Sequence, residues 1–298
     1  MRLFSGVELV WWQFLLLAVG CTIVAGLTAV LLAPYAGRLR LVSRRRRDRF
    51  SRRSVPLTGG AGLLAGGAAA LWVLGAAPAS GEVVAIAGLF LVGLVDDIAE
   101  LPAAAKLLLQ AGVSLGAVVL LVPSATLVGL ALLVFMLLVN ACNYLDNMDG
   151  LLAGVALPSA VALALFGSSA GLGATVLMVA LPGVLILSRP PARIFLGDSG
   201  SHLVGALFGI DATRLLLADG KFQAGAFVPL CVVFAVPLAD VATVTVSRLR
   251  RGRPVFRGGT DHLSHRLVRL GWPVPRAVAL LVLASAVCGI ASLLLVHS

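Results

Sequence analysis

Apolar stretches long enough to cross a bilayer recur along almost the whole chain, and they restrict its possible folds more than any other feature. Of the 298 residues, 60% are hydrophobic and only 12% are charged, which is too apolar for a soluble domain. A membrane-spanning helix needs about 20 consecutive, mainly apolar residues. Ten windows separated by polar interruptions fit this description: 9–33, 57–79, 82–95, 104–122, 125–141, 151–167, 171–188, 201–218, 224–246 and 276–296.

These windows predict an all-α fold. Lipid offers no hydrogen-bond partners to the backbone, so each window must be helical, and the connections are too short for a second domain. We therefore expect one polytopic membrane domain over residues 1–298 with about ten transmembrane helices. The first window is too long for a signal-peptide core and lacks a convincing cleavage site, so we expect it to be retained as an anchor.

Basic residues gather in alternate connections. Nine arginines lie within 38–53 and eight within 248–276, and together with Lys106, Arg189 and Arg193 they make up 20 of the 23 basic residues. Because cytoplasmic connections carry the excess of Lys and Arg, we expect these connections to be cytoplasmic and both termini to be extracytoplasmic. The orientation of the chain in the membrane thus explains the net charge of +10, and binding of nucleic acid is not needed to explain it. The clusters also suit anionic membrane lipid or a phosphorylated substrate.

The unusual polar clusters follow the third, fifth, seventh and ninth windows, and this topology brings all four to the cytoplasmic face. A carboxylate at membrane depth is costly unless it faces a cavity, a partner or a metal. One aspartate at a helix end is commonly a cap or a solvated terminus, but five on one face favour a functional site. The clusters contain Asp96 and Asp97; Asn143, Asp146 and Asp149; Asp198 within 197–201; and His262, His265 and Arg266.

Clustered carboxylates without nearby thiols suit Mg²⁺ or Mn²⁺, which complete their shells with water and phosphate oxygens. We therefore expect a phosphorylated substrate. Neighbouring Asp96 and Asp97 point about 100° apart on a helix, so they should serve different atoms. Asp146 and Asp149 would share a face if their turn were helical.

Other residues near the acids have both structural and functional interpretations. Segment 197–201 opens a predicted helix whose free N–H groups can meet an anion, although such turns precede many helices. Lys106 either contacts phosphate or extends toward the interface. For His262 and His265, phosphate binding or an ordinary loop role is favoured over a zinc site. Asp240 is a candidate structural partner for one of these bases and is left out of the catalytic set.

Five motifs occur in order along the chain: Pro-x-x-Gly-Gly at 56–60, Gly-Leu-Val-Asp-Asp at 93–97, Lys-Leu-Leu-Leu-Gln at 106–110, Asn-x-x-Asn-x-x-Asp-x-x-Asp-Gly-Leu at 140–151, and Phe-Leu-Gly-Asp-x-Gly-Ser at 195–201. Each alone is weak, but the ordered set is specific. In these motifs the chain resembles the polyprenyl-phosphate N-acetylhexosamine-1-phosphate transferases of glycosyltransferase family 4. This superfamily contains phospho-MurNAc-pentapeptide translocase and the GlcNAc-1-phosphate transferases.

The resemblance implies transfer of a HexNAc 1-phosphate from a UDP-sugar to undecaprenyl or decaprenyl phosphate, with release of UMP. The sugar it favours is GlcNAc. The implied setting is the bacterial inner (plasma) membrane, with a cytoplasmic site that serves the first membrane step of cell-wall or surface polysaccharide synthesis. Monomer and homodimer both stay open.

The resemblance also implies residue roles. The Mg²⁺ ligands are Asp198 and Asp97, and either Asp96 or Asp97 deprotonates or aligns the lipid phosphate. Lys106 falls on a phosphate-binding position. The predicted nucleotide pocket consists of Asn143, Asp146, Asp149 and Phe195, with Phe195 stacking on uracil. The predicted histidine motif consists of His262 and His265, with Arg266 beside it.

Two departures from the family pattern leave the sugar open. Asp146-Asn-Met-Asp149 replaces the usual Asp-Gly-x-Asp, and His262-Leu-Ser-His265 replaces His-x-His-His. The stretch from Leu101 to Gln110 and the absence of the translocase's triple histidine resemble the GlcNAc branch more, with the phospho-MurNAc-pentapeptide branch as the alternative within the family. The rival functions are a cation-coupled transporter and a catalytically silent membrane scaffold of the same fold. We favour direct attack by the lipid phosphate, with a phospho-aspartate intermediate as the other route.

Overall fold

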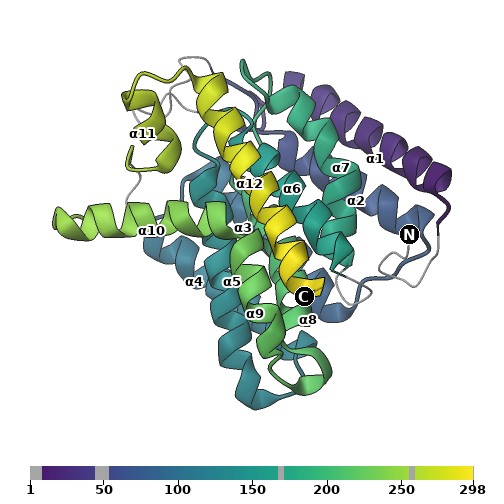
Figure 1. Ribbon diagram of the computed structural model, residues 1–298. Coiled ribbons are helices and arrows are strands. Elements are labelled where there is room, and N and C mark those ends of the chain that lie inside the picture. Colours follow the sequence, from purple (N-terminus) through teal and green to yellow (C-terminus); the bar gives the residue numbers. More distant parts are fainter. Residues whose placement is uncertain (1–8, 44–53, 167–170, 255–258, 298) are drawn as a thin grey trace.

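The computed structural model describes residues 9–43, 54–166, 171–254 and 259–297, which form a bundle of helices (Figure 1). These ranges contain no β-strand beyond one isolated antiparallel bridge between Val42 and Pro56. The all-α prediction is therefore confirmed. The α-helices are α1 (Trp11–Leu32), α2 (Gly59–Val73), α3 (Ser80–Ala99), α4 (Ala103–Leu121), α5 (Ala125–Leu145), α6 (Leu151–Leu165), α7 (Leu172–Ser188), α8 (Gly197–Leu216), α9 (Ala224–Val233), α10 (Ala235–Arg250), α11 (Leu263–Arg269) and α12 (Val274–His297). Two short 3-10 helices are η1 (Ala33–Tyr35) and η2 (Ala218–Gly220).

The apolar helices make this a multi-pass membrane protein, but they differ in their ability to span. Within the described ranges, four segments are long and apolar enough to cross a bilayer alone, and a bent pair raises the number to five. The four are Trp11–Tyr35, Ala103–Leu121, Ala125–Leu145 and Val274–Val296. Helices α2, α6 and α7 are apolar but shorter. The count of ten spans and the placement of the termini remain predictions.

The window 224–246 is not one continuous helix, which corrects the expectation of a single span there. It is divided into α9 and α10, which meet at an angle of 74°. Pro237 lies in the first turn of α10 and has no N–H to donate to the carbonyl of Val233, so the bend lies where one helical hydrogen bond is missing. Helix α10 therefore leaves the bundle sideways (Figure 1).

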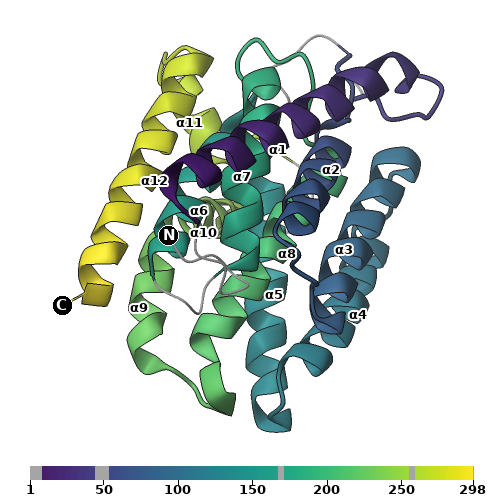
Figure 2. The same cartoon turned by 90° about the vertical axis from the view of Figure 1, so that its right-hand side faces the viewer.

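Helix α8 lies inside the bundle, where it contacts α2, α3, α5, α7 and α9 (Figure 2). Almost all of its residues are buried, including polar ones. Small residues permit this close packing: a Cβ on Gly205 would lie 2.5 Å from the Cα of Val139 in α5. The start of α8, which carries the predicted acidic motif, is consequently held between α3 and α5.

Two acids inside the bundle cap helix ends. Asp211 of α8 accepts hydrogen bonds from the N–H groups of Gly173 and Ala174 at 3.0 and 2.6 Å, at the start of α7. Glu82 accepts the N–H of Ala79 at 2.8 Å at the start of α3 and pairs with Arg214 of α8. These contacts satisfy backbone donors that would otherwise be buried without partners. Asp211 and Glu82 thus have a structural explanation, which weakens the transporter alternative.

Replacing Gly205 with Ala should push α5 and α8 apart. Overpacking of this kind costs about 1 to 3 kcal/mol of unfolding free energy, so the melting temperature of the detergent-purified protein should fall. Gly112→Ala in α4 is the matched control, because no atom lies within 4 Å of its added Cβ. The control should melt at or slightly above the unmodified temperature, since Ala favours helix. Equal melting of the two variants would contradict the close α5–α8 contact.

Candidate active site

A cavity of about 250 Å³ lies where the polar ends of α3, α5 and α8 meet the start of α4. Gly259 and His262, from the segment just before α11, also line it. Six residues predicted from the sequence line it: Asp96, Lys106, Asn143, Asp146, Asp198 and His262. Its lining also includes Gln110, Asn140, Tyr144, Asn147 and Arg248. Segments far apart in sequence therefore meet at one polar cavity.

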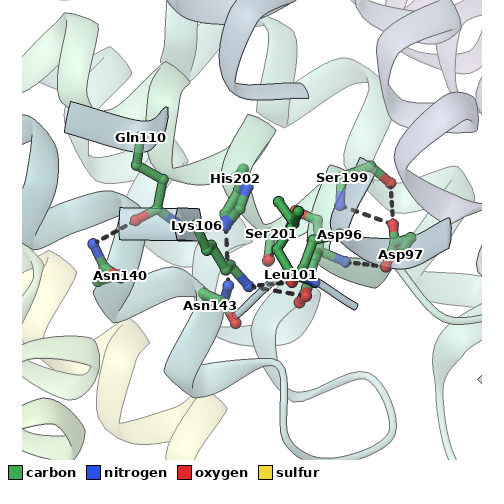
Figure 3. A network of polar contacts seen from close by, with 11 residues as sticks. Asp96, Asp97, Leu101, Lys106, Gln110, Asn140, Asn143, Ser199, Ser201 and His202 are labelled. Atoms are coloured by element: carbon green, nitrogen blue, oxygen red, sulfur yellow. Dashed lines mark hydrogen bonds and ion pairs between the residues drawn. The ribbon is translucent and has the colours of Figure 1, made fainter. Parts of the chain in front are cut away.

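Lys106 joins the acids of two helices (Figure 3). Its Nζ lies 2.8 Å from Oδ2 of Asp96 and 2.9 Å from Oδ2 of Asp198. The other oxygen of Asp96 accepts the N–H of Leu101 at 2.7 Å, which fixes the carboxylate where α3 turns into α4. Asp96, Lys106 and Asp198 thus form a bridged group on the cavity wall.

Asp97 caps the start of α8 (Figure 3). Its Oδ1 accepts the N–H of Asp198 at 2.8 Å, and its Oδ2 accepts the N–H and the hydroxyl of Ser199 at 3.0 and 2.8 Å. Gly197 makes this approach possible, because its φ is +74° and a Cβ there would lie 2.7 Å from Asp97 Oδ2. The anion expected at this helix start is the protein's own carboxylate. The prediction that Asp96 and Asp97 serve different atoms is confirmed.

The three acids carry more negative charge than Lys106 offsets. All three lie outside the predicted apolar windows. Burial, reinforced by Asp198, raises the pKa of Asp96 to about 6 and the pKa of Asp97 to about 7. Burial also disfavours the charged form of Asp198, but the nearby Lys106 cation and a hydrogen bond with Asp96 hold the pKa of Asp198 well below its usual range. The Asp198 carboxylate is therefore ionised and suited to a cation.

The donor set fits a hard divalent cation that also takes ligands from a substrate. Among the residues described, no group of three or more His, Cys, Asp or Glu is arranged to hold a metal by itself. Mg²⁺ commonly uses one or two carboxylates and fills its shell with water and phosphate oxygens. Asp198 on the cavity wall suits this mode, which leaves room for phosphate.

His202 contacts two cavity-lining residues, Gln110 and Asn143, and the sequence analysis missed it. Its ring is fully buried, and its Nε2 lies 2.8 Å from Nε2 of Gln110 and 3.0 Å from Nδ2 of Asn143. Both amide nitrogens are donors, so Nε2 acts as the acceptor and the ring proton is on Nδ1. Asn140 donates to Oε1 of Gln110 at 3.2 Å, which extends the network (Figure 3). His202 thereby fixes the amide of Asn143. Its signal was a histidine directly after the Gly-Asp-Ser-Gly-Ser motif, inside an apolar window.

Asp149 and Phe195 are not among the cavity-lining residues, although both are predicted nucleotide contacts. Helix α5 ends at Leu145, so the turn 146–149 is not helical and the two acids do not share a helix face. Asp149 instead accepts the N–H of Ala192 at 3.0 Å. Phe195 packs with Val55 and Leu57 in a small apolar cluster and is only 6% exposed. Their nucleotide roles remain predictions.

The segment that carries His262 and His265 contributes His262 to the cavity wall. His262 lines the wall, and its Nδ1 lies 2.8 Å from Oδ2 of Asp240, so the expected pairing of Asp240 with one of the bases is confirmed. His265 is buried, with its ring centroid 5.5 Å from that of His262. Arg266 donates to the backbone oxygen of Asp261 at 3.1 Å and is not among the lining residues.

Comparison with known proteins shows the family of the chain. The sequence model of glycosyl transferase family 4 matches residues 80–215, which include most of the cavity-lining residues. A Streptomyces coelicolor protein, whose glycosyltransferase name is provisional, is 35% identical over 294 residues, covering 92% of this chain and 67% of the relative. The chain belongs to glycosyl transferase family 4.

Further relatives of this transferase carry more specific names. The decaprenyl-phosphate N-acetylglucosaminephosphotransferase of Mycobacterium leprae is 33% identical over 238 residues, which cover 64% of this chain and 58% of the relative. The undecaprenyl-phosphate alpha-N-acetylglucosaminyl 1-phosphate transferase of Escherichia coli K12 is 30% identical over 158 residues, which cover 50% of this chain and 42% of the relative. The transferase thus spans about three fifths of the mycobacterial relative and less of the enterobacterial one.

Replacing Asp97 with Ala should destabilise the transferase even without metal or substrate. The change removes the acceptor of three hydrogen bonds at the start of α8. A loss of about 2 to 3 kcal/mol of unfolding free energy is expected for a buried cap of this kind. Thermal unfolding in EDTA measures it. Ser199→Ala is the comparison, because it removes only the hydroxyl bond and should cost less. An unchanged melting temperature for Asp97→Ala would show that the cap is not needed.

Proposed function

We propose that the protein transfers GlcNAc 1-phosphate from UDP-GlcNAc to undecaprenyl or decaprenyl phosphate and releases UMP. The observation that carries this proposal is the Lys106 bridge between Asp96 and Asp198 on the wall of a polar cavity. Membership of the family and the names of the mycobacterial and enterobacterial relatives support the sugar and the lipid. The apolar helices support a membrane setting for the acceptor.

The proposed metal is Mg²⁺, with Mn²⁺ as a substitute. We assign it to Asp198, with Asp97 as the second predicted ligand, although both oxygens of Asp97 already accept hydrogen bonds from α8. When bound, the cation supplies positive charge that stabilises the diphosphate in the transition state.

The chain's own residues have separate tasks in the proposed reaction. A lipid phosphate oxygen bonds to the β-phosphorus of UDP-GlcNAc, the bond from that phosphorus to the bridging oxygen breaks, and UMP leaves with the bridging oxygen. Asp96 aligns the attacking phosphate or takes its proton, and Lys106 offsets the charge of the two reacting anions. We favour direct attack over a phospho-aspartate route, because direct attack forms no covalent bond to a carboxylate that Lys106 already binds.

Binding of the donor is assigned to two groups of residues. Asn143 and Asp146 line the cavity, Asp149 contacts the 190–196 segment and Phe195 is part of that segment. These four residues form the proposed uridine region. His262, with His265 and Arg266 behind it, faces the sugar or phosphate oxygens. In the proposed topology ten spans put this cavity at the cytoplasmic face of the bacterial plasma membrane, and both termini lie on the other side.

Asp198→Asn should abolish turnover while the protein stays folded. The variant keeps the size of the side chain but removes the charge that would hold the cation. A loss of at least about 100-fold in kcat is expected for a metal ligand of this kind. UMP release from UDP-GlcNAc, with Mg²⁺ and polyprenyl phosphate, is the measurement. Asp211→Asn is the control, because it changes another buried acid away from the cavity and should lower stability rather than kcat.

Near-normal turnover of Asp198→Asn would refute the metal assignment. A panel of UDP-sugars offered to the unmodified protein tests the substrate separately. We expect UDP-GlcNAc to give the fastest UMP release. Faster release from UDP-MurNAc-pentapeptide would move the protein to the other branch, and no UMP release from any donor would refute the proposed function.

A further inference from the structure

The carboxylate of Asp240 binds two consecutive residues at the start of α11, His262 and Leu263. Asp240 lies in α10, just beyond the bend, and is fully buried. Its Oδ2 lies 2.8 Å from Nδ1 of His262, and its Oδ1 accepts the N–H of Leu263 at 2.7 Å. Both oxygens are therefore committed to two consecutive residues at the start of α11.

These contacts fix the orientation of the His262 ring. An ionised carboxylate only accepts hydrogen bonds, so the ring must carry a proton on Nδ1. The ring of Tyr144 also packs edge-on at 5.8 Å with an angle of 84° between the planes, which restricts rotation. With Nδ1 engaged, Nε2 at the other edge of the ring is the nitrogen left for a ligand in the cavity that His262 lines.

The position of this pair suits a phosphorylated ligand. The cavity that His262 lines is also lined by Lys106 and Arg248, so three nitrogen side chains from α4, α10 and the start of α11 line the same cavity as Asp198. Lys106 also pairs with Asp96 and Asp198, and Arg248 with Asp261. A nucleoside diphosphate sugar has oxygens for all of them. A fixed ring loses less conformational freedom on binding than a free one, which favours affinity and alignment.

We propose that Asp240 is a positioning residue for the transferase: through His262 it presents Nε2 to the diphosphate of the sugar nucleotide. This inference rests on the proposed function. Asp240 itself touches neither substrate nor metal. Its charge matters because an asparagine in its place would turn an N–H donor toward Nδ1 and favour the opposite tautomer of the ring.

A double-mutant cycle tests whether Asp240 acts through His262. The variants are Asp240→Asn, His262→Gln and the double variant, assayed for kcat and KM by UMP release. We expect each single change to lower kcat/KM by about tenfold or more, and the double change to lower it no further than the worse single one, because both remove the same interaction. Losses that multiply would overturn the proposal.

Asp211→Asn combined with His262→Gln is the matched control. Asp211 is also fully buried and caps a helix, but it lies at the start of α7. Its effect on kcat/KM should therefore be small and should multiply with that of His262→Gln. If Asp240 had only a structural role, Asp240→Asn would behave like Asp211→Asn. It would lower the melting temperature, and its effect on kcat/KM would multiply with that of His262→Gln.

The tautomer of His262 is read in the unmodified protein and does not depend on turnover. In ¹⁵N spectra of histidine-labelled unmodified protein, assigned with His262→Gln, the Asp240 contact predicts a proton on Nδ1. A neutral ring protonated only on Nε2 would overturn the proposal. If the unmodified protein releases no UMP, the proposed function fails, whereas the tautomer still decides whether Asp240 orients the ring.

Discussion

The hydrogen bonds from the start of α8 to Asp97 are the contacts on which the site depends. They place the first turn of a buried polar helix against the end of α3, and so bring Asp198 within reach of the Lys106 ammonium that also binds Asp96. A helix start inside a bundle has unsatisfied N–H groups, and a carboxylate is the strongest acceptor for them. The same contact therefore stabilises the fold and sets the spacing of the site.

Buried carboxylates serve both structure and chemistry in this protein, and their partners distinguish the two. Asp211 and Glu82 accept hydrogen bonds from N–H groups at helix starts, and Glu82 also pairs with Arg214; both acids lie away from the cavity. Asp96 and Asp198 instead share one lysine at a cavity wall, which leaves excess negative charge facing open space. Such excess charge in a low-dielectric setting is costly unless a cation or a proton offsets it. That cost is the physical reason for expecting a metal and a phosphorylated ligand at this place.

The meeting of Asp96, Asp146 and Asp198 was predicted from the sequence, on the expectation that alternate windows end at one face and that the arginines mark this face. The break between α9 and α10 was not predicted, since a hydropathy window averages over Pro237 and ignores its missing N–H. His202 was missed because a single histidine in an apolar window gives no periodic signal, and its role depends on Gln110 and Asn143 from other helices. The positions of Asp149 and Phe195 depend on how the 190–196 segment folds, which residue spacing does not determine.

Anomalous diffraction from Mn²⁺ in crystals of the protein grown with UDP-GlcNAc tests most directly whether the acidic turns form one site for a cation and a diphosphate. The account predicts an anomalous peak in the cavity, about 2.0 to 2.3 Å from an Asp198 carboxylate oxygen, with phosphate oxygens in the same shell. A metal bound only elsewhere on the protein, with nucleotide in this cavity and no cation beside Asp198, would contradict it.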